Sequence, residues 1–439
     1  SGVGVMFGAQ VHFTDLVVRS LRDDQTGVTR YGVGATRHTR VELQRARIED
    51  VYGVGVVAAD DGQVVAEDVL VRDVHAPPAS CCGAGLMAYQ TGHITARRVH
   101  VTGAQGIAAY SAWDGALIEA ENVTLTDTRA GNDGSEGRGL AVEHTGGLQA
   151  SRLVITNMER TALLVSDPGS EANIDGLFLA GVRATGRDLV ARGVDLIFGA
   201  RLSLANAWIT DTEGIGLASQ GSGSTLLAQD VVVHRIAPSP VVGLGLGLSV
   251  GEGATLEADR VAVARVGGAG VVVSAARSAH ANATFADLYL RGVEPQPVQL
   301  EVASRDLQGN VVRPRASYGV QVDPECDLQV ERAVIGDVEH GFLRAGGVFR
   351  ATDTTVARAR YWGAEIGSPD QRRTFVRVCA VATEHPEILR DQQLIRAFFD
   401  TNQDPPAPCR RPPCNARGAP LVEAAVTSTT NVVGLPLGP

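Results

Sequence analysis

A recurring pattern of apolar residues restricts the fold of this chain more than any other feature of its 439 residues. The pattern is clearest in residues 64–93, VVAEDVLVRDVHAPPASCCGAGLMAYQTGH, and again in residues 94–117, ITARRVHVTGAQGIAAYSAWDGAL. Each copy reads Φ-x-A-x-x-Φ-x-Φ, then a turn, then G-Φ-x-Φ, where Φ is apolar. Alternation in three short runs predicts three strands per coil, with alternate side chains facing a shared interior.

The spacing of these coils shows a doubled period. Their first apolar positions are Val11, Val41, Val64, Ile94, Ile118, Leu148, Ala172, Leu202, Leu226, Leu256, Ala283, Leu328 and Phe349. As far as Leu256 the steps alternate between about 30 and about 24 residues, so the repeat is a pair of coils roughly 54 residues long. Helical repeats would need long runs of 3.6-residue spacing, and no such run occurs before residue 383.

Coils such as LQASRLVITNMERTALLVSDPGS and LSLANAWITDTEGIGLASQGSG resemble the right-handed parallel β-helix of the pectin-lyase-like superfamily. The resemblance covers residues 1–380 and implies an all-β solenoid of about 13–14 coils with a two-coil super-repeat. Each coil then buries its apolar face against its neighbours.

Three segments depart from the repeat. The step from Ala283 to Leu328 indicates an insertion at residues 293–317, which we expect to form a β-hairpin around Gln308-Gly309-Asn310. Residues 381–400 change to a spacing of three and four, which predicts a C-terminal capping helix, and residues 401–439 form a Pro-rich tail. Because the chain opens on a G-Φ-x-Φ strand at Gly2, we expect further coils or domains upstream.

Composition narrows the possible partners. The net charge of −10 argues against nucleic acid, and no apolar run of about 18 residues predicts a membrane span. All 39 basic residues are arginines, which suggests a GC-rich bacterial genome. The segment DTNQD at residues 400–404 begins like a calcium loop but lacks its glycine and closing glutamate, so we expect no cofactor, with calcium as the alternative.

Six cysteines favour an oxidising compartment, and hence an extracellular or cell-surface protein. Cys409 and Cys414 frame the short loop CRRPPC, which a disulfide would staple. Cys326 and Cys379 flank the last coils and are the other disulfide candidates. For the adjacent pair Cys81 and Cys82 the sequence leaves bonding open.

The longer coil of each pair carries extra residues between its second and third strands. These insertions lie at residues 22–31, 75–82, 129–138, 183–192 and 236–244. They predict a row of loops along one edge, spaced by two coils or roughly 10 Å. A second recurrent feature is an Asp or Asn that ends the Φ-x-Φ strand, which we assign to turn formation rather than catalysis. It occurs at Asp50, Asp73, Asp127, Asn157 and Asp211.

Catalytic motifs of the superfamily are missing. The third strands contain one acidic residue, Asp195, near their start, and neither the NTD, DD, HG and RIK motifs nor a WiDH sequence occurs. Glycoside chemistry needs two positioned groups, and the best available set is Glu143, His144 and Asp195. We expect Glu143 and Asp195 to lie two coils apart, at or beyond the separation used by inverting enzymes.

A possible binding surface involves aromatic residues. Aligned on the glycine of each third strand, the fifth residue is Tyr89, Tyr110, Glu143 and Ser166 in successive coils. Trp113 and His144 follow in the turns just beyond, so this alignment predicts a binding site of Tyr89, Tyr110, Trp113, Glu143 and His144. Such rings suit the C–H faces of sugars, although a tyrosine stack that only shields the sheet is the alternative.

The sequence therefore favours a non-catalytic binding or structural module whose partner is a polysaccharide or a surface protein. A divergent polysaccharide lyase or glycoside hydrolase is the first alternative. A structural spacer within a larger surface protein is the second.

Overall fold

The computed structural model describes residues 2–21, 30–77, 82–185, 189–275, 279–295, 304–305, 311–312, 317–323, 325–344, 348–366, 373–376 and 379–381. The chain divides into residues 1–205 (unit 1) and residues 206–439 (unit 2), and each unit is described by itself. The described residues form strands and turns, so they provide no helix that could cross a membrane.

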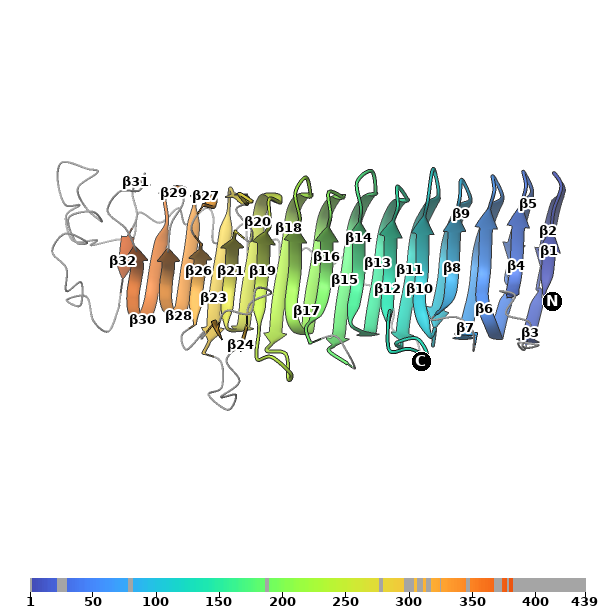
Figure 1. Cartoon of the computed structure of the whole chain (residues 1–439), viewed down its shortest axis with the longest axis horizontal. Coiled ribbons are helices and arrows are strands. Elements are labelled where there is room, and N and C mark those ends of the chain that lie inside the picture. Colours follow the sequence, from blue (N-terminus) through green and yellow to red (C-terminus); the bar gives the residue numbers. More distant parts are fainter. Residues whose placement is uncertain are drawn as a thin grey trace. The chain divides into compact units, whose positions relative to one another are not determined.

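Unit 1 is built from coils of three strand segments, and each segment pairs in parallel with its counterpart in the next coil (Figure 1). The first segments belong to β2 (Gln10–Thr14), β5 (Arg40–Gln44), β7 (Gln63–His75), β9 (His93–Thr102), β11 (Leu117–Thr128), β13 (Gly147–Glu159) and β15 (Glu171–Arg183). From β7 on, these strands continue around a corner into the second segment. Earlier second segments lie in β3 (Val17–Leu21) and β6 (Arg47–Ala59).

The third segments of unit 1 form a separate ladder. They are β1 (Val3–Val5), β4 (Arg30–Thr36), the end of β6, β8 (Gly83–Tyr89), β10 (Gly106–Ala112), β12 (Arg138–Glu143), β14 (Thr161–Ser166) and β16 (Ala191–Ile197). β17 (Arg201–Gln220) begins in unit 1 and ends in unit 2.

The core of unit 1 consists of the apolar positions that the repeat predicts. Ile94 pairs with Ile118, and Ile118 with Leu148, and these side chains are buried. Val101, Leu125 and Ile155 form a second buried row on the same strands. Each apolar side chain thus packs against those of the coils on either side, which gives one continuous core.

Unit 2 repeats the arrangement. Its parallel strands are β18 (Thr225–Ala237), β19 (Leu246–Gly251), β20 (Thr255–Gly267), β21 (Ala269–Ser274), β22 (Asn282–Phe285), β23 (Leu288–Glu294), β26 (Tyr318–Val322), β27 (Asp327–Glu331), β28 (Ala333–Arg344), β29 (Val348–Thr352), β30 (Thr355–Ile366), β31 (Arg373–Val376) and β32 (Cys379–Val381). Within the predicted insertion, β24 (Ser304–Arg305) pairs antiparallel with β25 (Val311–Val312), as expected for a hairpin. The predicted helix and tail, residues 381–400 and 401–439, lie almost wholly outside the described residues.

Single residues in the left-handed conformation make the corners of the coils. Asp50, Asp73, Asp127 and Asn157 in unit 1 have φ between 55° and 60°, and Asp211 in unit 2 has φ of 53°. Asp and Asn tolerate this conformation better than most residues because their short side chains can bond nearby backbone. The assignment of these residues to turn formation is confirmed.

A second column of corners, between the first and second segments, follows the two-coil repeat. In unit 1 it contains Asp15, Arg45, Asp68, Arg98, Asn122 and Arg152, all with φ between 51° and 56°. Arg45 donates two hydrogen bonds to Asp15, at 2.7 and 2.9 Å, and Arg98 donates two to Asp68, at 2.6 and 3.0 Å. In unit 2, Arg260 does the same to Asp230, with both bonds at 2.6 Å. The odd and even coils of each pair therefore carry different, complementary corner residues.

Candidate functional site

The outward side chains of the third strands in unit 1 include most residues of the predicted site. Ala112 of β10 pairs with Tyr89 on one side and with Glu143 on the other, whereas Tyr110 pairs with Met87 and Ala141. The alignment that placed Tyr110 level with Tyr89 and Glu143 is therefore wrong by two residues. The cause is that Gly106 pairs with Gly83 and not with Gly85.

The aromatic residues nevertheless meet, because Trp113 lies between them. Its ring centroid lies 4.7 Å from that of Tyr89, 6.3 Å from that of Tyr110 and 4.8 Å from that of His144. Trp113 occupies the turn after β10 with φ of 67°, an unusual backbone conformation for a bulky residue. Its side chain is 37% exposed. We call Tyr89, Tyr110, Trp113 and His144 the aromatic cluster.

Tyr110 is a partly buried member of the aromatic cluster. It packs against the buried side chains of Ile107, Ala141 and Leu164. Its hydroxyl hydrogen-bonds Glu143, and burial, followed by the charge of Glu143, raises the pKa of Tyr110 well above its usual range. Tyr110 thus joins the aromatic cluster to the buried residues of the sheet, whereas Trp113 is partly exposed.

Glu143 is held by a neighbouring arginine. Arg138 Nη1 donates a hydrogen bond to Glu143 Oε1 at 2.9 Å, and Arg138 Nε lies 2.9 Å from Glu136 Oε2. All three side chains are no more than 21% exposed. Burial raises the pKa of Glu136, against the opposing effect of Arg138. Glu143 is therefore part of a compact ion network at the edge of the aromatic cluster.

The other two residues of the predicted catalytic set have separate partners. His144 Nδ1 lies 3.0 Å from Asp167 Oδ2, and the backbone N–H of His144 donates to the same oxygen. Asp195 is buried and its carboxylate lies 3.5 Å from Arg192 Nε.

The pairing of the third strands gives the distance between Asp195 and Glu143. Asp195 pairs with Leu164, and Leu164 with Ala141, two residues before Glu143 on β12. Two coils and two residues correspond to roughly 12 Å, which exceeds the carboxylate separation of inverting glycosidases. Unit 1 does not bring these two carboxylates together as a catalytic pair.

A polar groove on the first segments of unit 1 is a feature that the sequence reasoning missed. It crosses β9, β11, β13, β15 and the start of β17, and its volume is about 660 Å³. Its polar lining consists of Thr95, Arg97, Glu119, Glu121, Gln149, Ser151, Asn173, Asp175 and Ser203. Along one row of paired positions, the long side chains of Arg97 and Glu121 are followed by the short ones of Ser151 and Asp175. This drop in side-chain size hollows the surface.

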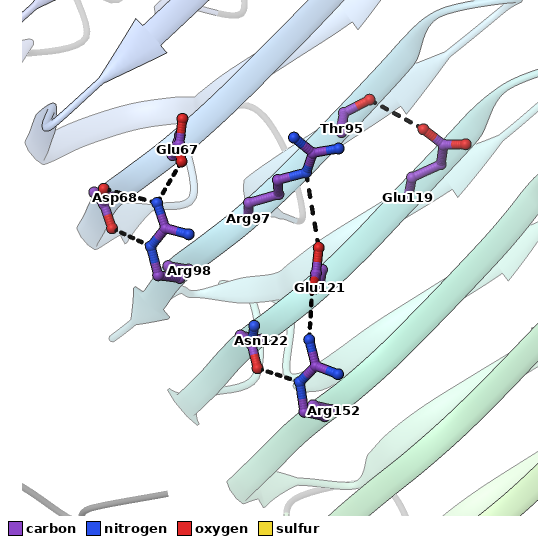
Figure 2. A network of polar contacts seen from close by, with 9 residues as sticks. All are labelled: Glu67, Asp68, Thr95, Arg97, Arg98, Glu119, Glu121, Asn122 and Arg152. Atoms are coloured by element: carbon purple, nitrogen blue, oxygen red, sulfur yellow. Dashed lines mark hydrogen bonds and ion pairs between the residues drawn. The ribbon is translucent and has the colours of Figure 1, made fainter.

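Ion pairs fix the side chains at one end of the polar groove. Figure 2 shows Glu121 between two arginines, with Arg97 Nε at 3.8 Å and Arg152 Nη2 at 2.5 Å. Glu119 accepts a hydrogen bond from Thr95 Oγ1 at 3.1 Å and lies 3.1 Å from His93 Nε2. These contacts link three coils and restrict the rotamers of the long side chains. The end of the polar groove near β9 and β11 is therefore preorganised.

The row of loops is confirmed where the structure describes it. Asn132, in the insertion at residues 129–138, donates through Nδ2 to the carbonyl of Pro77 at 3.0 Å. Gln105 in the intervening coil donates to Asn132 Oδ1 at 2.9 Å, and its own Oε1 accepts from the backbone of Ala76 at 3.2 Å. Insertions two coils apart thus contact each other along one edge of unit 1.

The cysteines differ in part from the prediction. Cys82 is disulfide-bonded. Cys326 is a buried free thiol, so its assignment as a disulfide candidate is wrong. The reason is that its side chain belongs to the interior of unit 2, where burial raises its pKa to about 11. The side chains of Cys379, Cys409 and Cys414 lie outside the described residues.

Within the described ranges, no group of three or more His, Cys, Asp or Glu side chains is arranged to hold a metal ion. The DTNQD segment at residues 400–404 lies outside those ranges.

Three solved structures are similar to this chain. The A-module of mannuronan C-5 epimerase AlgE6 from Azotobacter vinelandii is 11% identical with a TM-score of 0.39, over 86% of this chain and 92% of that one. Pectate lyase Pel9A is 12% identical with a TM-score of 0.38, over 73% and 77%. A hyper-glycosylated fragment of TibA is 11% identical with a TM-score of 0.23, over 84% and 99%.

The similarity is one of fold. The parallel strand pairing establishes a parallel β-helix, as the resemblance to the pectin-lyase-like superfamily implied. No protein-family model and no curated protein matches the chain. At these identities and TM-scores, we infer neither activity nor ligand from the three solved structures.

Proposed function

We propose that unit 1 is a non-catalytic glycan-binding module that stacks a sugar ring on Trp113. The exposed Trp113 ring, supported by Tyr89 and His144 on either side, is the observation that carries this proposal. Sugar rings offer apolar C–H faces, and a rigid aromatic surface binds them at little cost in conformational entropy. The hydroxyls around such a ring can bond polar groups beside the aromatic cluster, of which Asp114 and Thr145 are the nearest in sequence.

The contacts of the carboxylates support binding rather than catalysis. Glu143 is bonded to Arg138 and Tyr110, and Asp167 to His144. Asp195 is buried and lies beside Arg192. A general acid or base must reach the scissile bond together with a second group, and this arrangement supplies no such pair. The aromatic cluster can therefore hold a sugar without cleaving it.

The test compares two exposed aromatic residues at equivalent turns. Trp113 follows β10, and Phe198 follows β16 with φ of 55° and 60% exposure. The full chain is screened on an array of oligosaccharides, and the best ligand is then titrated by calorimetry. We expect Trp113→Ala to weaken binding about tenfold, the loss of roughly 1.4 kcal/mol of stacking, and Phe198→Ala to leave it unchanged.

Two outcomes would contradict the proposal. One is that no sugar on a broad array binds the wild-type chain. The other is that Trp113→Ala binds as tightly as wild type. Incubating the same oligosaccharides with the chain and analysing them by mass spectrometry tests the lyase or hydrolase alternative, for which we expect no new products.

We also infer that the protein works outside the cytoplasm, at the cell surface or beyond. The disulfide of Cys82 supports this location, because cytosolic thiols are kept reduced. Fractionation of cells that produce the protein, followed by immunoblotting, should find it in the surface or secreted fraction. Recovery of the protein from the cytosol with Cys82 reduced would contradict the inference.

A further inference from the structure

We propose that the polar groove is a second binding site of unit 1, which takes an extended, uncharged glycan segment running across β9, β11, β13 and β15. This inference rests on the proposed function only for the class of ligand. It does not require the aromatic cluster to bind anything.

The arrangement of polar groups suits a chain of hydroxyl-bearing units. Thr95, Glu119, Gln149 and Asn173 occupy one continuous row of paired positions, one on each successive coil. Coils stack at roughly 4.8 Å, so each advance along the solenoid presents a new hydroxyl, carboxylate or amide. Gln149 and Asn173 are exposed, and both amides can donate as well as accept. Sugar hydroxyls have the same dual capacity.

The shape of the polar groove favours a ligand that lies across the strands. A volume of about 660 Å³ falls in the range of pockets that bind small molecules. The side chains shorten where Ser151 follows Glu121 in the adjacent row. A ligand that runs across the strands, from one coil to the next, would therefore have the amides of Gln149 and Asn173 on one side and the short side chain of Ser151 beneath it.

Charge selects against acidic polysaccharides. The lining contains three carboxylates, Glu119, Glu121 and Asp175, against one guanidinium, Arg97. Arg97 lies beside Glu121, and Glu121 also binds Arg152. Both guanidinium groups at this end are therefore already paired with the carboxylate of Glu121. A uronate chain would place its carboxylates against an excess of negative charge, whereas an uncharged chain would meet no such repulsion.

The polar groove and the aromatic cluster are separate surfaces. The aromatic cluster lies at the ends of the third strands and in the turns that follow them, whereas the polar groove lies on the first segments. The two sites can therefore be tested independently.

The experiment titrates the full chain with two probes, cellohexaose and hexagalacturonate. Ser151→Trp fills the polar groove, and Gln44→Trp places the same side chain in the same row on β5, outside the groove. Trp is well tolerated on an exposed strand, and circular dichroism checks the fold of both variants. Gln149→Ala with Asn173→Ala removes the two amides without adding bulk.

We expect cellohexaose to bind the wild-type chain and hexagalacturonate to bind at least tenfold more weakly. Ser151→Trp and the double alanine variant should each weaken cellohexaose about tenfold, as expected for two lost hydrogen bonds, and Gln44→Trp should not. Raising the salt from 50 to 500 mM should change the affinity less than twofold, because an uncharged ligand is not screened.

Several results would overturn the inference. They are absence of cellohexaose binding at millimolar concentration, tighter binding of hexagalacturonate than of cellohexaose, and equal binding by Ser151→Trp and wild type. Trp113→Ala separates this inference from the proposed function. If that variant alone loses binding, the polar groove is not a site and the proposed function stands. If only the groove variants lose binding, the polar groove is a site and the proposed function fails.

Discussion

Removing one arginine from an inter-coil pair should destabilise unit 2 in proportion to the burial of its partner. Arg332 donates through Nε and Nη2 to the two oxygens of Asp287, at 2.8 and 3.1 Å, and the Asp287 side chain is only 8% exposed. Arg332→Met keeps most of the side-chain stem but leaves this carboxylate without its guanidinium. Breaking a fully buried pair costs about 3–5 kcal/mol, and because Arg332 itself is 40% exposed we expect a loss of about 2 kcal/mol.

Arg235→Met is the matched control in the same unit. Arg235 makes the same pair of bonds to Asp211, at 2.7 and 2.5 Å, but both side chains are more than 40% exposed. Urea unfolding followed by circular dichroism should show a lower midpoint for Arg332→Met than for wild type. The midpoint of Arg235→Met should be almost that of wild type, and the m-values of all three proteins should be equal. Equal losses in the two variants would refute the reasoning from burial, and so would an unchanged Arg332→Met.

Three further predictions concern stability and reactivity. Arg265 in unit 2 has φ of 55°, so Arg265→Gly should be about 1 kcal/mol more stable than Arg265→Ala in the same urea assay; equal stability would show that the corner is unstrained. Leu125→Ala should cost about 2–5 kcal/mol because Leu125 is fully buried between Val101 and Ile155, and a loss below 1 kcal/mol would mean that the core collapses around the gap. Cys326 has a pKa raised to about 11 by burial, so peptide mapping should find it unlabelled by iodoacetamide at pH 8 in the folded chain and labelled in urea. Since the exposed thiol has a pKa near 9, this group's contribution to stability should be complete below pH 9 and be lost as the pH rises toward 11; labelling of the folded chain at pH 8 would contradict both statements.

The sequence predicted the core and the corners because each depends on a property of the residue itself. Ile94, Ile118 and Leu148 recur at alternating positions, and burial of one face follows directly from that spacing. Asp73 and Asp127 could be assigned to turns because few residue types tolerate a left-handed backbone.

The position of Tyr110 could not be predicted in the same way, because glycine has two roles in these coils. Gly106 has φ of 125° at the start of β10, whereas Gly85 sits where an added Cβ would come within 2.4 Å of the carbonyl oxygen of Ala108. The motif GAGLMA contains Gly83, which pairs with Gly106, as well as Gly85, so alignment on the wrong glycine shifts the register by two residues.

The polar groove was missed because it depends on contrasts between adjacent coils. Ser151 and Asp175 are ordinary surface residues when each strand is considered alone. They form a hollow only because Arg97 and Glu121 precede them in the same row. Small polar residues at successive outward positions of the first segment were the available signal. The alignment of the first apolar positions already places these residues in one row, so finding the hollow required comparing side-chain sizes along that row rather than along each strand.

The alternation of aspartate and arginine at the corners limits how this chain can change its length during evolution or by design. Deleting residues 68–97 would remove a single winding and bring Arg45 against Arg98. Two neighbouring guanidinium groups would then stand where an arginine and an aspartate had formed an ion pair. Deleting a whole double winding of about 54 residues would restore opposite charges at the junction. Because these corner pairs are exposed, the effect is small, and gene duplication or shortening in such a protein is expected to favour even numbers of windings only slightly over odd ones.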